Sequence, residues 1–524
     1  MGKLVTAASK IFDYIVVGAG SAGCVLANRL TEDGRYSVLL LEAGPEDSNP
    51  WIHVPIGYGK TMFNPVLNWC FSTEPDPNMN GRQIYWPRGR TLGGSSSVNG
   101  LIHIRGQNED FDEWARLGAQ GWAFHDIEKY FEKTLLSIEH IQSGNELVDA
   151  FIAGAKELGI PQNDDFNGPT QEGVGYLHLT TRRGRRSSTS EAYLRPARRR
   201  SNLAIETNAF ATAVLWDGRR AKGVSYRQHG VDFEVLARSE VILAAGALQS
   251  PQLLQLSGIG PGSLLQSYGI PVLADLPGVG ANLQDHLALR IQYKCSRPVT
   301  TNDDLRNWHS KLKTGLRYLF LRKGPMAVGV MTAGLITKVL PESIRPDMQV
   351  FLSTVSAEQR GSAPHLWSGF TIVYYPMRPT SRGRVEIGSV DPLTPPRMYS
   401  NYLSTDYDQR IMVAGAKLVR RIGVTPSFST YIKEEYAPGP SVMSDEEILE
   451  FIRNSGTSGY HPCGTCRMGS DSLAVVDPQL RVHSVAGLRV IDASVMPNVV
   501  SGNTNAATVM IAEKGADMIR NVNR

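Results

Sequence analysis

The chain has few cysteines, little net charge and no long hydrophobic run. Each of these absences argues against one class of protein: disulfide-rich, nucleic-acid-binding or membrane-spanning. Only five cysteines occur in 524 residues, and this odd number favours reduced thiols in a cytoplasm-like compartment over a disulfide framework. The formal net charge is only +4, so composition gives no reason to expect a nucleic-acid partner. No run of about 18 apolar residues is present, so we expect no transmembrane segment.

Signal sequences and repeats are also missing. The first residues, Met1–Lys10, lack an apolar core and a cleavage site, so we interpret them as a short leader and not as a signal peptide. We find no internal repeat and no long low-complexity tract. The length of 524 residues predicts two or more domains, because it exceeds what one hydrophobic core usually serves.

What the chain does contain is a strand, glycine turn, helix and strand at Phe12–Gly44. The turn carries Gly18, Gly20 and Gly23 in the spacing G-x-G-x-x-G, with Ser21 inside it. The first glycine allows a tight turn, the second lets a pyrophosphate approach the backbone, and the third lets the helix lie close to the strand. The N-terminal N–H groups of the helix would face the phosphates of a dinucleotide.

An acidic residue completes this unit. Glu42 follows the second strand, 19 residues beyond Gly23. A carboxylate there can accept hydrogen bonds from the hydroxyl groups of an adenosine ribose, and it would repel the 2′-phosphate of NADP. The alternative is an empty unit whose glycines serve packing only. We predict a bound dinucleotide, although this unit does not separate FAD from NAD.

A second strand-to-helix crossing is predicted further along the chain. Val241–Ala245 is an apolar strand, and Gly246 marks the turn after it. Ser250 and Pro251 have the form of an N-cap and a first helical residue. We therefore expect a helix that begins at Pro251.

The character of the sequence changes between residues 293 and 449. Strands alternate there, prolines become frequent, and no glycine turn suited to a phosphate occurs, as in an antiparallel sheet. From Tyr460 the first pattern returns, with a strand that ends at Asp492. We predict that the C-terminus closes the nucleotide domain and that a second domain is inserted into it.

Two polar residues near the C-terminus are the candidate catalytic groups. His461 stands in the turn YHPCGTCRMG, and Asn503 stands in SGNTNAAT before the last predicted helix. Oxidation of an alcohol removes a proton from oxygen and a hydride from carbon, and histidine is the natural base near neutral pH. A neutral amide can hold the alcohol oxygen as negative charge develops.

Other interpretations of these residues stay open. His461 could be a hydrogen-bonded loop histidine, and Asn503 could cap the last helix. A metal site would use His461 with Cys463 and Cys466, but one C-x-x-C without a second pair does not match a zinc pattern, so we predict no metal. A disulfide switch between the two cysteines is a further alternative.

Together these motifs resemble those of the glucose–methanol–choline (GMC) family of FAD oxidoreductases, from end to end. The resemblance also includes two signature-like stretches, Gly89–Asn99 and Gly246–Gly260. Among members, the chain is most similar to bacterial alcohol, choline and L-sorbose dehydrogenases. The resemblance implies an α/β, Rossmann-like FAD-binding domain with an inserted α+β substrate-binding domain built on a mostly antiparallel sheet. It implies FAD-binding segments at 1–150, 201–295 and 450–524, with the active site in the last, and substrate-binding segments at 151–200 and 296–449.

The resemblance also assigns roles to single residues. His461 would be the base that faces flavin N5, and Asn503 would be its partner. The residues implied to bind FAD are Gly18, Gly20, Ser21, Gly23, Glu42, Arg90, Leu92, Gly94, Ser95, Asn99, Gly100, Leu101, Ile102, Ala211, Asp492, Ala493 and Thr504. Some members attach FAD through a histidine in the first signature. Here Val98 stands at that position and has no nucleophile, so we expect non-covalent FAD.

The function implied is oxidation of a primary alcohol, with hydride transfer to flavin N5. The alternatives are a lyase that cleaves cyanohydrins, a non-catalytic flavoprotein, and an oxidase that uses oxygen where a dehydrogenase uses a quinone. Side chains that could line the substrate pocket are Met326, Met331, Phe351 and Trp367.

The expected partners are a small alcohol and an electron acceptor, either oxygen or a quinone. Arg182–Arg200 holds eight arginines, which predict a solvated charged face. The alternatives for this run are an anionic partner or a membrane surface. We expect a cytoplasmic protein, with peripheral membrane contact as the alternative, and the sequence does not determine the oligomeric state.

Overall fold

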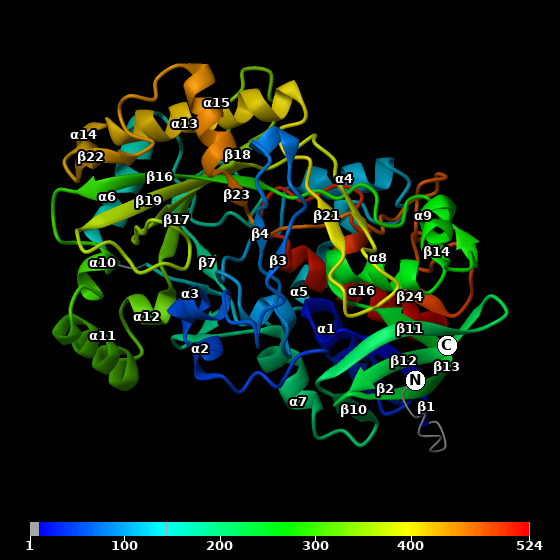
Figure 1. Ribbon diagram of the computed structural model, residues 1–524. Helices are drawn as coiled ribbons and strands as arrows, with labels where there is room; N and C mark the ends of the chain where they lie inside the picture. Colours follow the sequence, from blue (N-terminus) through cyan, green and yellow to red (C-terminus); the bar gives the residue numbers. More distant parts are fainter. Residues whose placement is uncertain (1–9, 143, 523–524) are drawn as a thin grey trace.

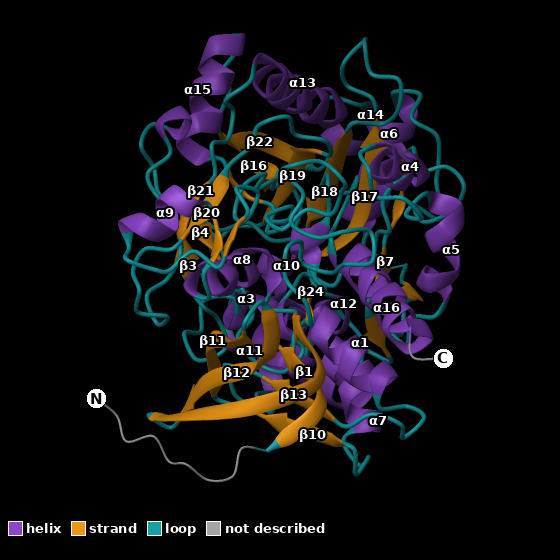
Figure 2. Cartoon of the chain, turned by 90° about the vertical axis from the view of Figure 1, so that its right-hand side faces the viewer, coloured by secondary structure: helices purple, strands orange, loops and turns teal. Residues whose placement is uncertain are grey.

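The structure, a computed structural model, describes residues 10–142 and 144–522, so the expected leader lies outside the described residues except for Lys10. Two seven-stranded sheets dominate these residues. Figures 1 and 2 show them at opposite ends of the molecule, with loops and helices between them. The site described below lies between the two sheets.

The first sheet contains strands from both the N-terminal and the C-terminal parts of the chain. Its strands are β1 (Ile11–Val17), β2 (Val38–Leu41), β10 (Leu203–Glu206), β11 (Ala209–Asp217), β12 (Arg220–Gln228), β13 (Val231–Leu243) and β24 (Leu488–Val490). The order is β10-β2-β1-β13-β12-β11, and β24 pairs with β13. Strands β10, β2, β1, β13 and β24 are parallel, whereas β11, β12 and β13 form an antiparallel meander. The apolar runs predicted as strands are buried here, as parallel strands require.

Helix α1 (Ser21–Leu30) packs against the last helix, α16 (Asn505–Val522). Two polar contacts join them. The Ser21 hydroxyl donates a hydrogen bond to Asn505 Oδ1 at 2.7 Å, and Arg29 forms an ion pair with the buried Glu513 at 2.8 Å. The two ends of the chain therefore meet in the first domain.

The predicted start of the second crossing helix is wrong. Helix α8 spans Gly246–Leu256, so Pro251 lies inside it and Ser250 is not its N-cap. A proline inside a helix leaves the carbonyl four residues earlier without its usual donor. The Thr465 hydroxyl replaces that donor, because it gives a hydrogen bond of 2.6 Å to the carbonyl oxygen of Ala247. Thr465, more than two hundred positions away in sequence, thus helps the helix to begin at Gly246, five residues before Pro251.

The second sheet is antiparallel throughout. Its strands are β6 (Gly173–Tyr176), β16 (Leu287–Cys295), β17 (Met331–Thr337), β18 (Met348–Ser353), β19 (Gly369–Pro376), β22 (Ile432–Ala437) and β23 (Thr457–Ser458). The order is β22-β16-β19-β18-β17-β6, with β23 paired to β16. The sheet therefore includes β16, which precedes the expected boundary at residue 296, and β23, which follows the expected boundary at 449. The reason is that β16 forms antiparallel pairs with β19 and β22 inside the expected segment and with β23 beyond it.

Other helices cover these sheets. Helices α6 (Glu146–Glu157), α13 (Asp406–Gly423) and α15 (Asp445–Ser455) pack around the second sheet, and α5 (Phe124–Glu132) packs against α16. Helix α4 (Asn108–Arg116) precedes α5. Within the described residues, no helix has both the length and the apolar character that crossing a membrane needs.

Candidate active site

The parallel strands of the first sheet end at one edge of a large cavity. Gly18 follows β1, Glu42 follows β2, Ala245 follows β13 by two residues, and Asp492 follows β24 by two residues. All four line a cavity of about 1020 Å³ that also reaches His461. Ligands of open α/β sheets bind beyond the carboxyl ends of the strands, so this cavity is the candidate site.

Glycines bring two turns of the backbone together at this edge. A Cβ atom on Gly23 would lie 1.9 Å from the carbonyl oxygen of Gly18, and one on Gly94 would lie 2.7 Å from the Cα atom of Gly20. A Cβ atom on Gly20, by contrast, would meet no other group closer than 4.0 Å. Gly23 and Gly94 are thus required for packing, whereas Gly20 presents an open face to the cavity. An anionic group can approach the backbone there.

Glu42 lies at the same edge and is buried. Its carboxylate accepts hydrogen bonds from the backbone N–H groups of Ala19 at 3.0 Å and Gly44 at 2.8 Å. Burial nevertheless raises the pKa of Glu42 to about 7, because the charged form loses hydration. Its charge therefore changes near neutral pH.

If Glu42 holds the ribose of the expected FAD, binding of FAD to the apoprotein will depend on pH. If the ionised carboxylate accepts the ribose hydroxyls, FAD affinity is expected to fall by up to about tenfold per pH unit below pH 7. Above pH 7 the affinity should level off, since Glu42 is then already ionised. Titration of apoprotein with FAD between pH 5.5 and 8.5, followed by flavin fluorescence, measures this slope. Glu42→Gln should bind more weakly and lose the slope; an unchanged slope would contradict the role.

The loop after the second glycine turn is held by a buried arginine. Arg186 donates hydrogen bonds to the Oδ1 atom of Asn99 at 2.6 Å and to its carbonyl oxygen at 2.7 Å. Burial lowers the pKa of Arg186 to about 9. This residue belongs to the arginine-rich run, so the prediction that the run is a solvated face fails at Arg186. A positive charge beside Asn99 and the cavity suits an electron-rich ligand.

The remaining residues predicted to bind the cofactor divide into two groups. Asp492 lines the cavity, and its carboxylate also accepts hydrogen bonds from the Gly246 N–H at 2.9 Å and the Ser250 hydroxyl at 2.6 Å. Three predicted residues lie behind the cavity wall and not on it: Gly23, Arg90 and Leu92. Those on the wall are Gly18, Gly20, Ser21, Glu42, Gly94, Ser95, Asn99, Gly100, Leu101, Ile102, Ala211, Asp492, Ala493 and Thr504.

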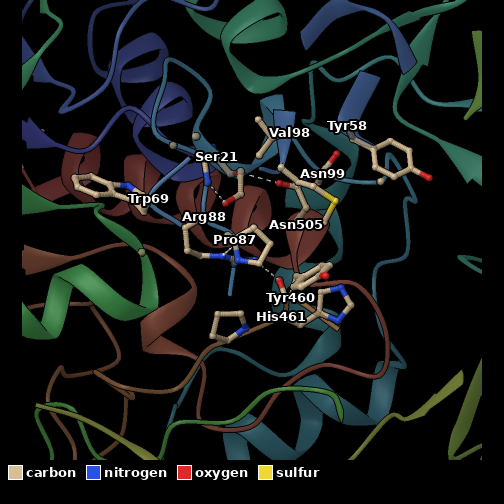
Figure 3. Close-up of a pocket in the computed structure, with 18 of the residues that line it drawn as sticks. Ser21, Tyr58, Trp69, Pro87, Arg88, Val98, Asn99, Tyr460, His461 and Asn505 are labelled. Carbon is tan, nitrogen blue, oxygen red and sulfur yellow. Dashed lines mark hydrogen bonds between the residues drawn. The ribbon is translucent and has the colours of Figure 1, made fainter. Parts of the chain in front are cut away.

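His461 and Asn503 meet at the other part of the cavity. The amide Nδ2 of Asn503 lies 2.9 Å from His461 Nε2, although 42 residues separate them in sequence. The amide oxygen of Asn503 is buried and has no partner among the described residues. It is therefore available to a ligand in the cavity. Figure 3 shows His461 beside Tyr460 and Arg88, with Ser21 and Asn505 at a different part of the same pocket.

His286, which sequence reasoning did not identify, determines which nitrogen of His461 carries the proton. His286 Nε2 lies 2.9 Å from the carbonyl oxygen of Met377, which can only accept, so this nitrogen must be the donor. In the neutral ring, Nδ1 of His286 is then an acceptor. It lies 2.9 Å from Nδ1 of His461, which must therefore donate. Nε2 of His461 is left unprotonated, with its lone pair available.

The surroundings keep both rings neutral. Burial and the nearby positive charges of Arg88 and Arg360 hold the pKa of His461 well below its usual 6.5. Burial also lowers the pKa of His286 to about 4. His461 is thus an unprotonated base at neutral pH.

The backbone at His461 is fixed by a buried carboxylate. The N–H of His461 donates to Oδ1 of Asp285 at 2.7 Å, and the hydroxyls of Tyr402 and Ser458 donate to its Oδ2. Arg88 donates to the Tyr460 carbonyl at 2.7 Å. Asp285 and His286 end the stretch PGVGANLQDH at residues 277–286, in which two adjacent titratable residues after a glycine-containing loop are the signal that could have pointed to them.

The wall near His461 carries positive charge and no carboxylate. Among the cavity-lining residues the only acids are Glu42 and Asp492, which lie at the strand ends. Arg88, Arg290 and Arg360 line the cavity. Of the four proposed pocket residues, Met326, Met331 and Phe351 line it, whereas Trp367 stacks on His365 outside it, with ring centroids 4.1 Å apart.

Comparison with known proteins identifies the family. The model of GMC oxidoreductases matches residues 12–288 with its N-terminal part and 379–512 with its C-terminal part. The chain belongs to the GMC oxidoreductase family. It is 42% identical to an alcohol dehydrogenase [acceptor] of Pseudomonas putida, over 97% of this chain and 96% of the relative. It is 41% identical to the mitochondrial choline dehydrogenase of Homo sapiens, over 97% and 90%.

A solved structure agrees with this assignment. The pyridoxine 4-oxidase from Mesorbium loti superposes with a TM-score of 0.88 at 30% identity, over 97% of this chain and 99% of the oxidase. The fold expected from the resemblance, an FAD-binding α/β domain with a substrate domain on an antiparallel sheet, is confirmed. Family membership supports FAD as the cofactor of this GMC oxidoreductase. The open face at Gly20 and the unpartnered amide oxygen of Asn503 fit such a group.

The cysteines of this GMC oxidoreductase take no visible part in the site. All five are free thiols, and Cys463 and Cys466 are buried side chains whose pKa is raised by burial. Raised thiol pKa values make nucleophilic or redox chemistry slow. Among residues 10–142 and 144–522, no group of three His, Cys, Asp or Glu side chains is placed to hold a metal.

Proposed function

We propose that this GMC oxidoreductase uses FAD to oxidise a primary alcohol to the aldehyde, with His461 as the base. The single observation that carries the proposal is the chain of contacts from the Met377 carbonyl through His286 to His461, which leaves Nε2 of His461 unprotonated and facing Asn503. When bound, FAD supplies the acceptor for the hydride that leaves the alcohol carbon. All other tasks fall to residues of the chain.

The proton is taken up by His461. An alcohol hydroxyl that displaces the present contact with Asn503 can donate to Nε2 of His461, and the proton then moves onto that nitrogen. Nδ1 already carries a proton, which is hydrogen-bonded to His286, so the His461 ring becomes a cation when Nε2 accepts the second proton. The Nδ2 group of Asn503 donates to the alcohol oxygen and stabilises the negative charge that develops there.

FAD is held by the first sheet and is non-covalent in this proposal. The open face at Gly20 would receive the pyrophosphate, the Glu42 carboxylate would accept the ribose hydroxyls, and Asn99 to Ile102 would border the flavin. Val98 lines the cavity and has no nucleophilic atom with which to form a bond to the flavin.

The charge of the wall favours an uncharged or anionic alcohol over choline. Quaternary ammonium groups are recognised by aromatic faces or by carboxylates. Here Arg290 and Arg360 line the cavity, and no carboxylate lines this side of it. Of the aromatic rings there, Tyr460 has the Arg360 guanidinium 4.9 Å from its centroid, and Tyr375 stacks on His286. A choline cation would therefore meet like charge, even though several relatives carry choline in their names.

Anaerobic mixing tests the proposal. Purified protein mixed with primary alcohols under nitrogen is expected to lose its flavin absorbance near about 450 nm. Uncharged alcohols should reduce the flavin at least about tenfold more efficiently than choline, which corresponds to about 1.4 kcal/mol of repulsion. Parallel assays with oxygen and with a soluble quinone then distinguish an oxidase from a dehydrogenase. Release of aldehyde and cyanide from a cyanohydrin without bleaching would replace the proposal by a lyase.

A further inference from the structure

Helix α11 (Trp308–Leu321) exposes an unusual amount of apolar surface. Its only buried residues are Thr314 and Tyr318, which attach it to the protein. The exposed fractions of its large apolar side chains run from 44% at Leu316 to 75% at Phe320. Figure 1 shows the helix at the lower left edge of the molecule, next to α12 (Pro325–Val328).

Five of these six exposed apolar side chains share one face of the helix, and Leu321 lies off it. Successive residues of an α-helix are rotated by about 100°, so residues spaced by three, four, seven or eight positions fall on one side. The residues on this face are Trp308, Leu312, Leu316, Leu319 and Phe320. Such a face normally packs on a core, and here no described residue covers it.

Positive charges border this apolar face on both sides. Lys313 and Arg317 follow it on one side, and Lys311 lies on the other, next to Arg322 at the end of the helix. All four are exposed, and the stretch 305–323 contains no Asp or Glu. Among the described residues none of the four takes part in an ion pair, although Lys313 and Arg317 act electrostatically on the half-buried Asp304.

Part of the arginine-rich run adds to the same charge. The hairpin of β8 (Thr181–Arg182) and β9 (Arg185–Arg186) turns at Gly184, whose Cβ position would lie 2.8 Å from the carbonyl oxygen of Arg322. The hairpin thus touches the end of α11. Arg182, Arg183 and Arg185 are exposed there. An acid beside them, Glu139, accepts hydrogen bonds from the backbone N–H of Arg183 and the hydroxyl of Thr181.

Helix α11 also borders the cavity of the active site. Leu305, Lys311, Gly315 and Met326 line the same cavity as His461. Lys311 is an exposed side chain, so the cavity reaches the surface beside the apolar face.

We propose that α11 and the hairpin 181–186 form a docking surface for an anionic lipid bilayer. An apolar stripe between two rows of cations is the arrangement that lies in a membrane interface, with the apolar side chains among the acyl chains and the cations at anionic headgroups. Docking this way turns the mouth of the cavity toward the bilayer. A reactant dissolved in lipid then enters the site without passing through water. This inference goes beyond the proposed oxidation and does not depend on it.

Vesicle sedimentation tests the docking surface with the holoenzyme. Wild type is expected to bind vesicles of phosphatidylcholine with about 30% phosphatidylglycerol, and to bind phosphatidylcholine alone at least about tenfold more weakly. The double variant Leu316→Glu/Phe320→Glu should bind the anionic vesicles at least about tenfold more weakly than wild type. The variant Lys313→Gln/Arg317→Gln should lose much of the preference for anionic lipid.

A matched control carries the same two charges elsewhere. Ile344 and Val424 are 94% and 77% exposed and lie outside α11, so Ile344→Glu/Val424→Glu should bind vesicles as wild type does. Turnover of a water-soluble alcohol with a soluble acceptor should be the same in all these proteins, which separates docking from catalysis. Absence of binding to anionic vesicles would overturn the proposal. So would a wild-type dimer in light scattering that becomes monomeric in Leu316→Glu/Phe320→Glu, because the face would then join two copies of the chain.

Discussion

Replacement of His461 by alanine is expected to slow reduction of the flavin by alcohol about 10²–10⁴-fold, the usual contribution of a positioned general base. The reason is that Nε2 of His461 is the unprotonated nitrogen next to Asn503, at 2.9 Å from its amide. The bound flavin should remain, since no residue at the glycine turns is changed. Anaerobic stopped-flow mixing with a primary alcohol measures the rate, and the visible spectrum measures the flavin content.

His483→Ala is the control for this experiment. His483 is another loop histidine, less buried than His461, with Nε2 3.4 Å from the carbonyl oxygen of Gly469, and it does not line the cavity. Its variant should reduce flavin as fast as wild type. If His461→Ala does so as well, with flavin bound, His461 is not the base.

The pH profile gives a second measure of the same assignment. A base works in its unprotonated form, and the pKa of His461 is held well below 6.5. With FAD kept saturating, so that protonation of Glu42 does not remove the cofactor, lowering the pH from 8 to 6.5 should therefore leave the rate of flavin reduction by wild type nearly unchanged, and the decline should begin only at lower pH. A decline centred at or above pH 6.5 would show that a different group, or a differently placed His461, accepts the proton.

Substitution of the middle glycine of the first turn is expected to give a folded but colourless protein. A Cβ atom on Gly20 meets no other group closer than 4.0 Å, so the side chain in Gly20→Val enters the cavity and not the core. There it would block the approach of a pyrophosphate to the backbone. Loss of two hydrogen bonds to a charged group, about 1.5–3 kcal/mol each, predicts at least about a hundredfold weaker FAD binding.

Two other glycines of the same unit sharpen this test. In Gly23→Val a Cβ atom would lie 1.9 Å from the Gly18 carbonyl oxygen, so this variant should lose the fold itself. Gly34→Asn is the control, because nothing lies within 4 Å of a Cβ there and asparagine tolerates its positive φ of 76°. Circular dichroism and thermal melting report the fold, and flavin absorbance after incubation with FAD reports binding. A yellow Gly20→Val protein would contradict the proposed place of the pyrophosphate.

The local parts of the fold could be predicted because their causes are local. The apolar strand before Gly18, the glycine spacing and Glu42 lie within a few dozen residues, and each obeys a rule that depends on neighbours in sequence. The last helix, predicted to follow Asn503, is present as α16. The start of α8 could not be predicted in this way, since it depends on a hydroxyl of Thr465 that reaches the Ala247 carbonyl across the fold.

The candidate site, too, has parts that follow from local sequence and parts that depend on contacts between distant segments. The pattern of residues alone was sufficient to propose His461, Asn503 and the glycine turns. Which nitrogen of His461 is free depends on His286, 175 residues earlier in sequence, and on the carbonyl of Met377, which directly follows strand β19. Likewise, Arg186 stood in a run of charges that predicts a solvated face, and only packing buries it against Asn99.

By itself, the sequence predicted a dinucleotide site at a glycine turn and a histidine and an amide near the C-terminus as candidate catalytic groups. These depend on short spacings that a chain cannot satisfy by accident in this order. The tertiary structure decided the protonation of that histidine, the positive wall around it and the uncovered apolar face of α11. Each of these arises where segments far apart in sequence are brought into contact, or where a face is left without a partner. Hydrogen bonding, burial and charge depend on which groups are neighbours in space, and the order of residues in the chain does not show that directly.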